Sequence, residues 1–292
     1  SFDYYNKVTS NLLLNVQVPA AVGYGNSNPL MNIGEVENKG IELSLTSHNI
    51  EGGFTWSSDF NFSANKNKVL KLGASGDPIL STGGAGIRHI TRIGDPIGSY
   101  YGYVVEGIYQ TQDEIKNAPV DKLAPNARPG DFRFKDVNGD GVIDANDRTV
   151  TGNYQPDFTY GVTNRFGFKN VELSFLIQGV EGAEVLNLTR RHLANGEANT
   201  NSYTTQLNRW ISPSQPGDGK TPRADRLGDL HGFNNRPSSY QVEDASYVRL
   251  RNVTLAYTFS NKFLGKYFSS LRIYGSGTNL FTKTDYVGYN PE

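Results

Sequence analysis

The stretch Gly53-Phe54-Thr55-Trp56-Ser57-Ser58-Asp59-Phe60-Asn61-Phe62-Ser63 decides the fold, because apolar and polar residues alternate along it. Successive side chains of a β-strand point to opposite faces, so this alternation gives the strand two different surfaces. One face carries Phe54, Trp56, Phe60 and Phe62, with Ser58 as the exception. The other carries Thr55, Ser57, Asp59, Asn61 and Ser63. The pattern predicts a strand of about ten residues that is apolar on one side and hydrated on the other.

The same two-residue period continues along the chain. Ile41, Leu43 and Leu45 alternate with polar residues just before this strand, and residues 49–53 connect the two as a hairpin. Further strand pairs with short connections are predicted at 87–93 and 99–109, 158–166 and 171–178, and 247–259 and 271–279. Phe2–Thr9 adds an opening strand, so about nine strands are expected. The pairs are separated by long segments rich in Gly, Pro, Asn and Asp, at 67–86, 111–156 and 180–245.

This order of short and long connections indicates the fold class. In an antiparallel meander it places every short turn at one end and every long loop at the other, as in outer-membrane barrels with periplasmic turns and extracellular loops. The sequence therefore predicts an all-β protein, an antiparallel transmembrane β-barrel with long extracellular loops. Lipid is expected to contact the aromatic face of the 53–63 strand. Bacterial single-chain barrels have even strand numbers, so nine strands indicate a fragment of a larger barrel.

Composition excludes several other classes of protein. The 292 residues include 28 basic and 29 acidic side chains and no cysteine. Without a basic run there is no electrostatic footprint for nucleic acid. Without cysteine there is no disulfide, no thiol nucleophile and no cysteine-ligated metal. No stretch approaches the roughly 18 to 20 apolar residues of a membrane helix, which leaves a strand-based membrane protein open.

A different all-β protein is the alternative. Alternating strands also build sandwiches, and tyrosine-rich strands occur in carbohydrate-binding modules, so a secreted, calcium-stabilised β-sandwich that binds glycans is the second hypothesis. The connections of a sandwich do not sort into short ones at one end and long ones at the other. Aromatic pairs such as Tyr4-Tyr5 and Tyr100-Tyr101 also lie near predicted strand ends, as in the aromatic girdles of a barrel.

Residues 136–147, Asp-Val-Asn-Gly-Asp-Gly-Val-Ile-Asp-Ala-Asn-Asp, form the sharpest local motif. A calcium loop of the EF-hand type places oxygen ligands at positions one, three, five, seven, nine and twelve, and glycine at position six. The matching ligands are Asp136, Asn138, Asp140, the carbonyl of Val142, Asp144 and Asp147, and Gly141 stands at position six. The sequence predicts a structural Ca²⁺ here, within the long loop 111–156. Two Asx-Gly turns are the alternative.

Other chemistry is weakly indicated. His48, His89, His192 and His231 show no metal spacing and no partners for a nucleophile, and no catalytic carboxylate pair stands out, so no enzyme is expected. The long loop 180–245 combines aromatic rings with planar donors, which suit the recognition of sugars or peptides. Its weak substrate-binding candidates are Tyr203, Trp210, Arg223 and Arg236. For each of them, packing within the loop is the simpler interpretation.

Six motifs in order resemble one family. They are Asp3-Tyr4-Tyr5-Asn6-Lys7-Val8-Thr9, residues 32–42 (Asn-Ile-Gly-Glu-Val-Glu-Asn-Lys-Gly-Ile-Glu), residues 94–102 (Gly-Asp-Pro-Ile-Gly-Ser-Tyr-Tyr-Gly), Gly130-Asp131 through Gly161, residues 245–253 (Ala-Ser-Tyr-Val-Arg-Leu-Arg-Asn-Val) and residues 277–282 (Gly-Thr-Asn-Leu-Phe-Thr). The chain resembles the C-terminal part of the barrel in SusC-like TonB-dependent outer-membrane transporters of the Bacteroidetes.

The resemblance implies a function and a location. It implies the outer membrane of a Gram-negative bacterium, uptake of glycans or peptides through a 22-stranded barrel, a SusD-like surface lipoprotein as partner, and energy from the TonB complex. It also implies that the plug, the TonB box, the first barrel strands and the last strand lie outside residues 1–292. The family's substrate contacts are spread over loops and plug, so the resemblance assigns no substrate residue here.

Overall fold

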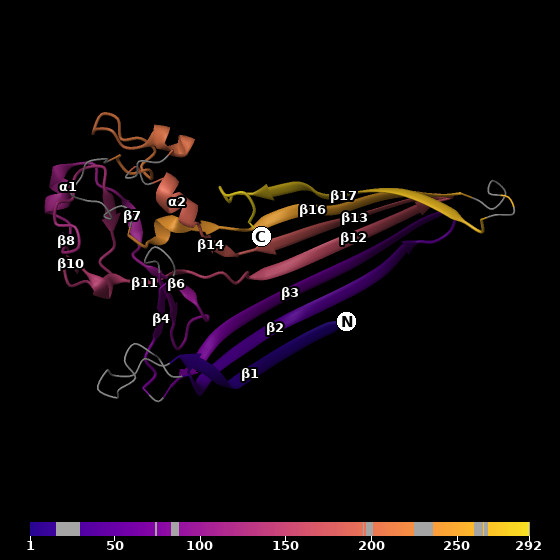
Figure 1. Ribbon diagram of the computed structural model, residues 1–292, viewed down its shortest axis with the longest axis horizontal. Coiled ribbons are helices and arrows are strands. Elements are labelled where there is room, and N and C mark those ends of the chain that lie inside the picture. Colours follow the sequence, from indigo (N-terminus) through magenta and orange to yellow (C-terminus); the bar gives the residue numbers. More distant parts are fainter. Residues whose placement is uncertain are drawn as a thin grey trace.

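The computed structural model describes residues 1–15, 30–73, 75–82, 88–194, 196, 201–224, 236–259, 265 and 268–291. Its dominant element is an antiparallel seven-stranded sheet in which each strand pairs with its neighbours along the chain (Figure 1). In order, the strands are β1 (Phe2–Asn15), β2 (Leu30–Ile50), β3 (Phe54–Leu72), β12 (Phe158–Phe168), β13 (Val171–Glu181), β16 (Tyr247–Phe259) and β17 (Leu271–Thr284). No helix in the described part of the chain is long and apolar enough to cross a membrane.

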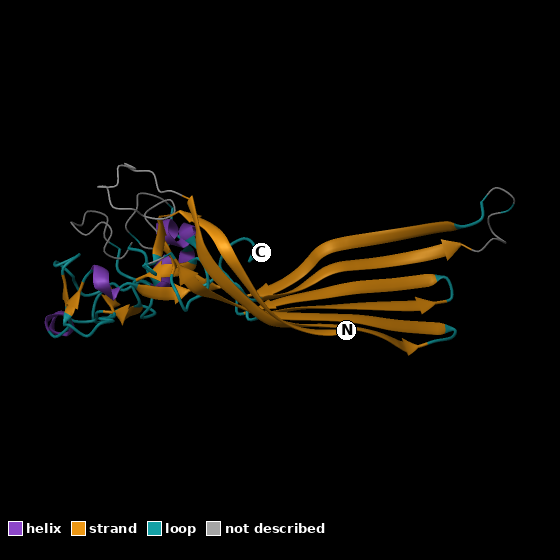
Figure 2. Cartoon of the chain, turned by 90° about the horizontal axis from the view of Figure 1, so that it is seen from below, coloured by secondary structure: helices purple, strands orange, loops and turns teal. Residues whose placement is uncertain are grey.

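The predicted separation of short and long connections is confirmed. Glu51–Gly53 join β2 to β3, and Lys169 and Asn170 join β12 to β13, at the end of the sheet where β16 also ends and β17 begins (Figure 2). The described residues of the connections 73–157 and 182–246 lie at the other end and contain the remaining described elements. The all-β, antiparallel character of the fold is therefore as expected.

The predicted number of strands is wrong, because the pair at 87–93 and 99–109 does not enter this sheet. Its described residues form the four-residue strands β5 (Arg88–Thr91) and β6 (Ser99–Gly102), which pair with each other outside the main sheet. The turn between them docks on the tip of β3, where Val69 donates its N–H to the carbonyl of Asp95 at 2.9 Å. Strands this short cannot span a bilayer, because a membrane strand needs about 9–11 residues.

Two strands are longer than predicted. The alternation suggested about ten residues for the 53–63 strand, but β3 has 19 residues and β2 has 21. From Asn65 to Lys68 the sequence is polar on both faces, so the apolar period that marked the strand is interrupted. The hydrogen-bonded ladder nevertheless continues to the pair Gly34 and Leu72.

The long connections fold into small sheets and short helices. A four-stranded sheet runs in the order β11-β6-β5-β4, and β7 pairs with β9, β8 with β10, and β14 with β15. The bounds are β4 (Ile79–Thr82), β7 (Val105–Ile108), β8 (Val120–Asp121), β9 (Phe132–Phe134), β10 (Val142–Ile143), β11 (Thr149–Gly152), β14 (Glu184–Leu186), β15 (Val242–Asp244), α1 (Gln112–Lys116), α2 (Leu188–Leu193) and the 3₁₀ helices η3 (Ala145–Asp147), η4 (Thr204–Asn208) and η5 (Ser239–Gln241).

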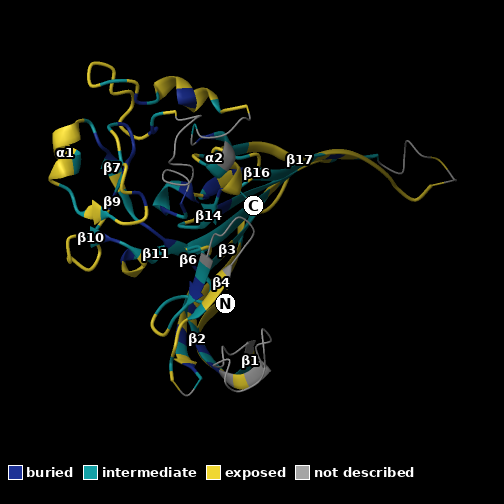
Figure 3. Cartoon of the chain, turned by 60° about the vertical axis from the view of Figure 1, so that its left-hand side comes forward, coloured by how far each residue is buried: buried dark blue, intermediate teal, exposed yellow. Residues whose placement is uncertain are grey.

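Buried residues concentrate in this loop region rather than on the main sheet (Figure 3). One core unites β7, β9 and β10 with the 201–224 segment through Tyr103, Ile108, Ala124, Phe132, Phe134, Ile143 and Trp210. A smaller core of Val36, Val69 and Leu72 closes the loop end of β2 and β3. The main sheet, by contrast, exposes much of its apolar surface.

Candidate functional site

The main sheet has one apolar face that the described residues leave uncovered. Register places Leu45 opposite Phe60 and Phe60 opposite Val162, and on the neighbouring strands Leu173 opposite Leu255. Their surfaces are solvent-accessible: Leu45 is 57% and Leu255 is 55% exposed. A β-sandwich would cover such a face with a second sheet. In Figures 1 and 2 the described strands form a single layer instead.

Aromatic rings gather toward both ends of this face. Near the short turns, the ring of Phe166 stacks on Trp56 with 5.8 Å between centroids and on Phe54 at 6.2 Å. Nearer the loop region, Phe62 stacks on Phe158 at 5.6 Å. Aromatic residues near both edges of an apolar band are typical of the two interfaces of a membrane strand protein. Phe60 and Phe175 add two rings between these groups on the same face.

Ser58, the exception in the alternating pattern, belongs to a polar pair within the apolar face. Its hydroxyl donates to the side-chain oxygen of Asn164 at 2.7 Å, and the indole N–H of Trp56 donates to the same oxygen at 3.0 Å. Ser58 and Asn164 are direct cross-strand partners. The polar groups therefore satisfy one another within the sheet, which lowers the cost of placing them in an apolar surface.

The opposite face carries charges that form ion pairs between strands. Asp59 accepts from Thr46 at 2.8 Å and forms an ion pair with Arg165. Glu172 pairs with Arg272 at 2.9 Å. Arg165, Glu172 and Arg272 also line a cavity of about 650 Å³ near the short turns. The sequence does not predict these ion pairs, because alternation indicates which face a residue lies on and not which residue of another strand it contacts.

Three of the four loop candidates for substrate binding are enclosed in the loop region. Trp210 is 9% exposed, and its indole N–H donates to Gln110 at 3.1 Å. Arg223 donates to the buried carboxylate of Asp131 at 2.8 Å. These side chains hold the loop together in this conformation, as the packing interpretation expected.

Arg236 and Tyr203 complete the candidate set. Arg236 is 8% exposed and pairs with Asp121 at 2.8 Å, while its guanidinium carbon lies 4.2 Å from the ring centre of Phe134. Tyr203 is half-buried and precedes η4. Substrate contact by any of the four stays a prediction.

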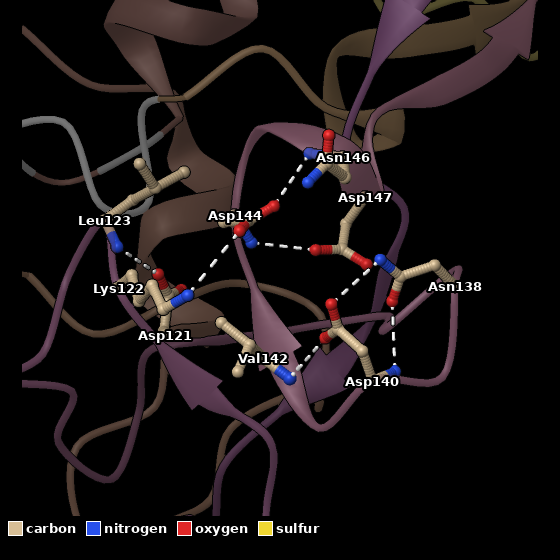
Figure 4. Close-up of polar contacts among 9 residues, drawn as sticks. All are labelled: Asp121, Lys122, Leu123, Asn138, Asp140, Val142, Asp144, Asn146 and Asp147. Carbon is tan, nitrogen blue, oxygen red and sulfur yellow. Dashed lines mark hydrogen bonds and ion pairs between the residues drawn. The ribbon is translucent and has the colours of Figure 1, made fainter.

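Backbone hydrogen bonds close the calcium-like loop (Figure 4). Asp136 accepts from the N–H groups of Gly139 at 2.7 Å and Gly141 at 2.8 Å, and Asp140 accepts from Val142 at 2.9 Å. Asp147 is completely buried. The loop therefore forms the Asx turns of the alternative interpretation, with its carboxylates directed at peptide groups.

The remaining predicted ligands follow the same arrangement. The amide group of Asn138 donates to Asp140 at 3.0 Å, and Asp144 accepts from the N–H of Asn146 at 2.8 Å. Within the described residues, no three or more His, Asp or Glu side chains are grouped to hold a metal ion. A bound cation would have to draw the oxygens toward one point, so calcium binding stays a prediction.

The histidines form no common site in the described chain. His48 lies in β2 next to the short turn, whereas His89 lies in β5 with its ring centre 5.5 Å from that of Tyr100. His231 and the side chain of His192 lie outside what the structure describes.

The structure combines an antiparallel amphipathic sheet, short turns at one end and folded loops at the other, an arrangement that outer-membrane β-barrels share. Among solved structures, the fold is similar to the RagAB peptide transporter, with a TM-score of 0.78 and 22% identity over 99% of this chain and 30% of that one. The RagAB peptide importer in its closed-closed state gives a TM-score of 0.73 over the same shares of both chains. No protein-family model matches the chain.

Curated sequence relatives match almost the whole length of the chain. TonB-dependent receptor P3 of Formosa agariphila is 38% identical over the whole chain, and TonB-dependent receptor SusC of Bacteroides thetaiotaomicron is 28% identical over 99% of it. The chain spans 28% and 27% of the lengths of these two relatives. The predicted resemblance is confirmed: the chain is related, over its whole length, to part of the SusC-like TonB-dependent receptors. The relatives are named as receptors, which agrees with the expectation of a non-enzyme.

Proposed function

We propose that this chain forms part of the wall of an outer-membrane β-barrel that imports nutrients in the manner of SusC-like TonB-dependent transporters. The observation that carries the proposal is the main sheet itself, which is apolar and exposed on one face and polar and ion-paired on the other. In a bilayer the exposed apolar face contacts lipid, and the polar face borders an aqueous lumen.

The position of the connections gives the orientation. Short turns face the periplasm and the folded connections 73–157 and 182–246 face outside, as in other barrels of this kind. The loop region would then form part of the outer substrate cavity and offer a surface to a SusD-like lipoprotein. Energy would come from the TonB complex through a part of the protein outside residues 1–292. The proposed cargo is an oligosaccharide or a peptide.

A pair of adjacent substitutions in β16 tests the two faces. Val253 lies on the apolar face opposite Phe175, and register places Phe175 opposite Asn164 and Asn164 opposite Ser58, midway between Phe54 and Phe62. Thr254 lies on the polar face opposite Ser174. In the full-length protein, Val253→Arg should lower the free energy of unfolding from lipid vesicles by about 2–4 kcal/mol, because it places a charge near the bilayer midplane. Thr254→Arg should cost less than about 1 kcal/mol, because its charge remains in water and only one half-buried hydrogen bond, to Asn252 at 3.1 Å, is lost. Reversible denaturant unfolding from vesicles measures both.

The two variants are matched in strand, depth and introduced charge. A protein that tolerates Val253→Arg as well as Thr254→Arg would not have the proposed lipid face. A protein that folds without lipid or detergent would overturn the membrane location altogether, since the open edges and apolar face of the sheet need partners.

A further inference from the structure

Two lysines stand directly opposite each other just above the apolar face. Register pairs Lys39 of β2 with Lys66 of β3, two positions beyond Ile41 and Ala64 and four beyond Leu43 and Phe62. Because side chains two and four residues apart share a face, both ammonium groups lie on the same face as the apolar residues. Both lysines are exposed. On the lipid-side face, the residues thus change from apolar to cationic within two positions along each strand.

This juxtaposition is unfavourable in the isolated protein. Like charges directly opposite in an antiparallel ladder destabilise it. In the described chain, neither Lys39 nor Lys66 has a carboxylate within ion-pair distance, and the ammonium group of Lys39 lies 6.0 Å from the ring centre of Tyr4. Elsewhere on these two strands the lysines are opposed by acids: register places Lys68 opposite Glu37, and Lys71 pairs with Glu35 at 3.9 Å.

The position of the pair along the strand matches the edge of a membrane. From Phe54 to Phe62 the strand rises by about 27 Å at about 3.4 Å per residue. At the usual tilt of about 40° this corresponds to about 20 Å along the membrane normal, close to the roughly 25 Å band of a barrel. Lys66 therefore lies just beyond the outer boundary of the apolar face, on the side of the long connections.

We propose that Lys39 and Lys66 bind the phosphate of a phosphorylated lipid headgroup in the outer leaflet. The proposal rests on the membrane orientation given under the proposed function. A phosphate placed between the two ammonium groups would replace their repulsion with two charge-assisted contacts. The neighbouring apolar residues, including the exposed ring of Tyr4, would contact the acyl chains of the same lipid. Charge complementarity thus selects an anionic lipid.

Lipid titration of the full-length protein in neutral detergent tests this site. The probes are diphosphoryl lipid A and the same lipid without its phosphates, with bound lipid counted by native mass spectrometry at low ionic strength. The double variant Lys39→Gln/Lys66→Gln should bind diphosphoryl lipid A about 25-fold more weakly, at about fivefold per lysine. The dephosphorylated lipid should not distinguish it from wild type. Without lipid, the double variant should melt at the same temperature or higher, since the repulsion is gone.

Two further variants separate charge from position. Lys7→Gln is the matched control, because Lys7 of β1 pairs with Asn38, the neighbour of Lys39 in β2, and so lies on the opposite face. It should keep wild-type affinity. Lys39→Arg/Lys66→Arg keeps both charges and should bind within a few-fold of wild type.

Equal binding by wild type and the double glutamine variant would overturn the proposal. So would equal loss in Lys7→Gln. These outcomes are distinct from failure of the proposed function, which would appear as equal effects of arginine at Val253 and Thr254.

Discussion

Asp147 is predicted to hold the 136–147 loop closed through the backbone in the absence of calcium. One carboxylate oxygen accepts from the N–H of Val137 at 2.9 Å, and the other accepts from the N–H of Asp144 at 2.7 Å. The side chain has no exposed surface. It therefore joins the beginning of the loop to its end, and no water molecule can readily replace either contact.

Asp147→Asn gives the magnitude of this contribution. Asparagine retains one acceptor oxygen, but its amide group would face one of the two backbone donors. The change loses one hydrogen bond to a charged group, worth about 1.5–3 kcal/mol, and leaves a buried donor unpaired, at about 1–3 kcal/mol. After partial relaxation, we expect the local free energy of opening to fall by about 2–4 kcal/mol.

Hydrogen exchange of the Val137 and Asp144 amides measures this opening in the presence of a chelator. Asp140→Asn is the matched control, because Asp140 accepts from Val142 at 2.9 Å but is exposed, so that water can take its place. It should cost less than about 1 kcal/mol. Equal protection in the two variants would refute the reasoning, because burial and the double acceptor role would then contribute nothing.

Three other predictions concern the loop region. If the loop 136–147 binds Ca²⁺, isothermal titration calorimetry should detect one bound ion per chain in the wild type and no binding in Asp136→Ala. Absence of binding heat in the wild type would overturn the calcium prediction. Phe132→Ala should cost about 3–5 kcal/mol in the loop region, because the ring is completely buried, and limited proteolysis should show cleavage of the loop while the strands stay resistant. Burial alone would raise the pKa of Asp218, but hydrogen bonds from the N–H groups of Thr221 and Lys220 outweigh it and lower that pKa. Asp218 therefore stabilises the loop region above the pKa that its carboxyl has in the unfolded chain, and this stabilisation is lost as the pH falls through the lower pKa of the folded state. In Asp218→Asn, the rate at which a protease cleaves the loop should depend less on pH in the acid range.

The strand faces could be predicted from the sequence, because period two reports directly on side-chain direction. Phe60 and Asp59 are on the faces that alternation assigned to them, and the hairpin turn at 51–53 is close to the predicted one. The pattern failed at Ser99–Gly102, where alternating residues form a short strand buried within the loop region. Alternation shows that a segment is extended, but it does not show which sheet accepts it.

The loop candidates illustrate a second limit. Trp210 and Arg223 were singled out because aromatic and guanidinium groups suit ligands, yet the same groups suit internal packing and buried ion pairs. The partner that decides between these roles for Arg223 is Asp131, 92 residues away in sequence. Spacing within one segment carries no information about a contact of this range, so neither residue's environment could be predicted.

The membrane orientation explains why the loop region has a core of its own. In a water-soluble β-protein, long connections can pack on the apolar face of the sheet. If lipid covers that face, as we propose, it is not available to the loops, and the connections must bury apolar surface among themselves. The core around Phe132 and Trp210 meets this need by joining residues 103–143 to the 201–224 segment. Segments from two different connections are thereby fixed against each other, which makes the outer end of the sheet a folded surface instead of a set of independent loops.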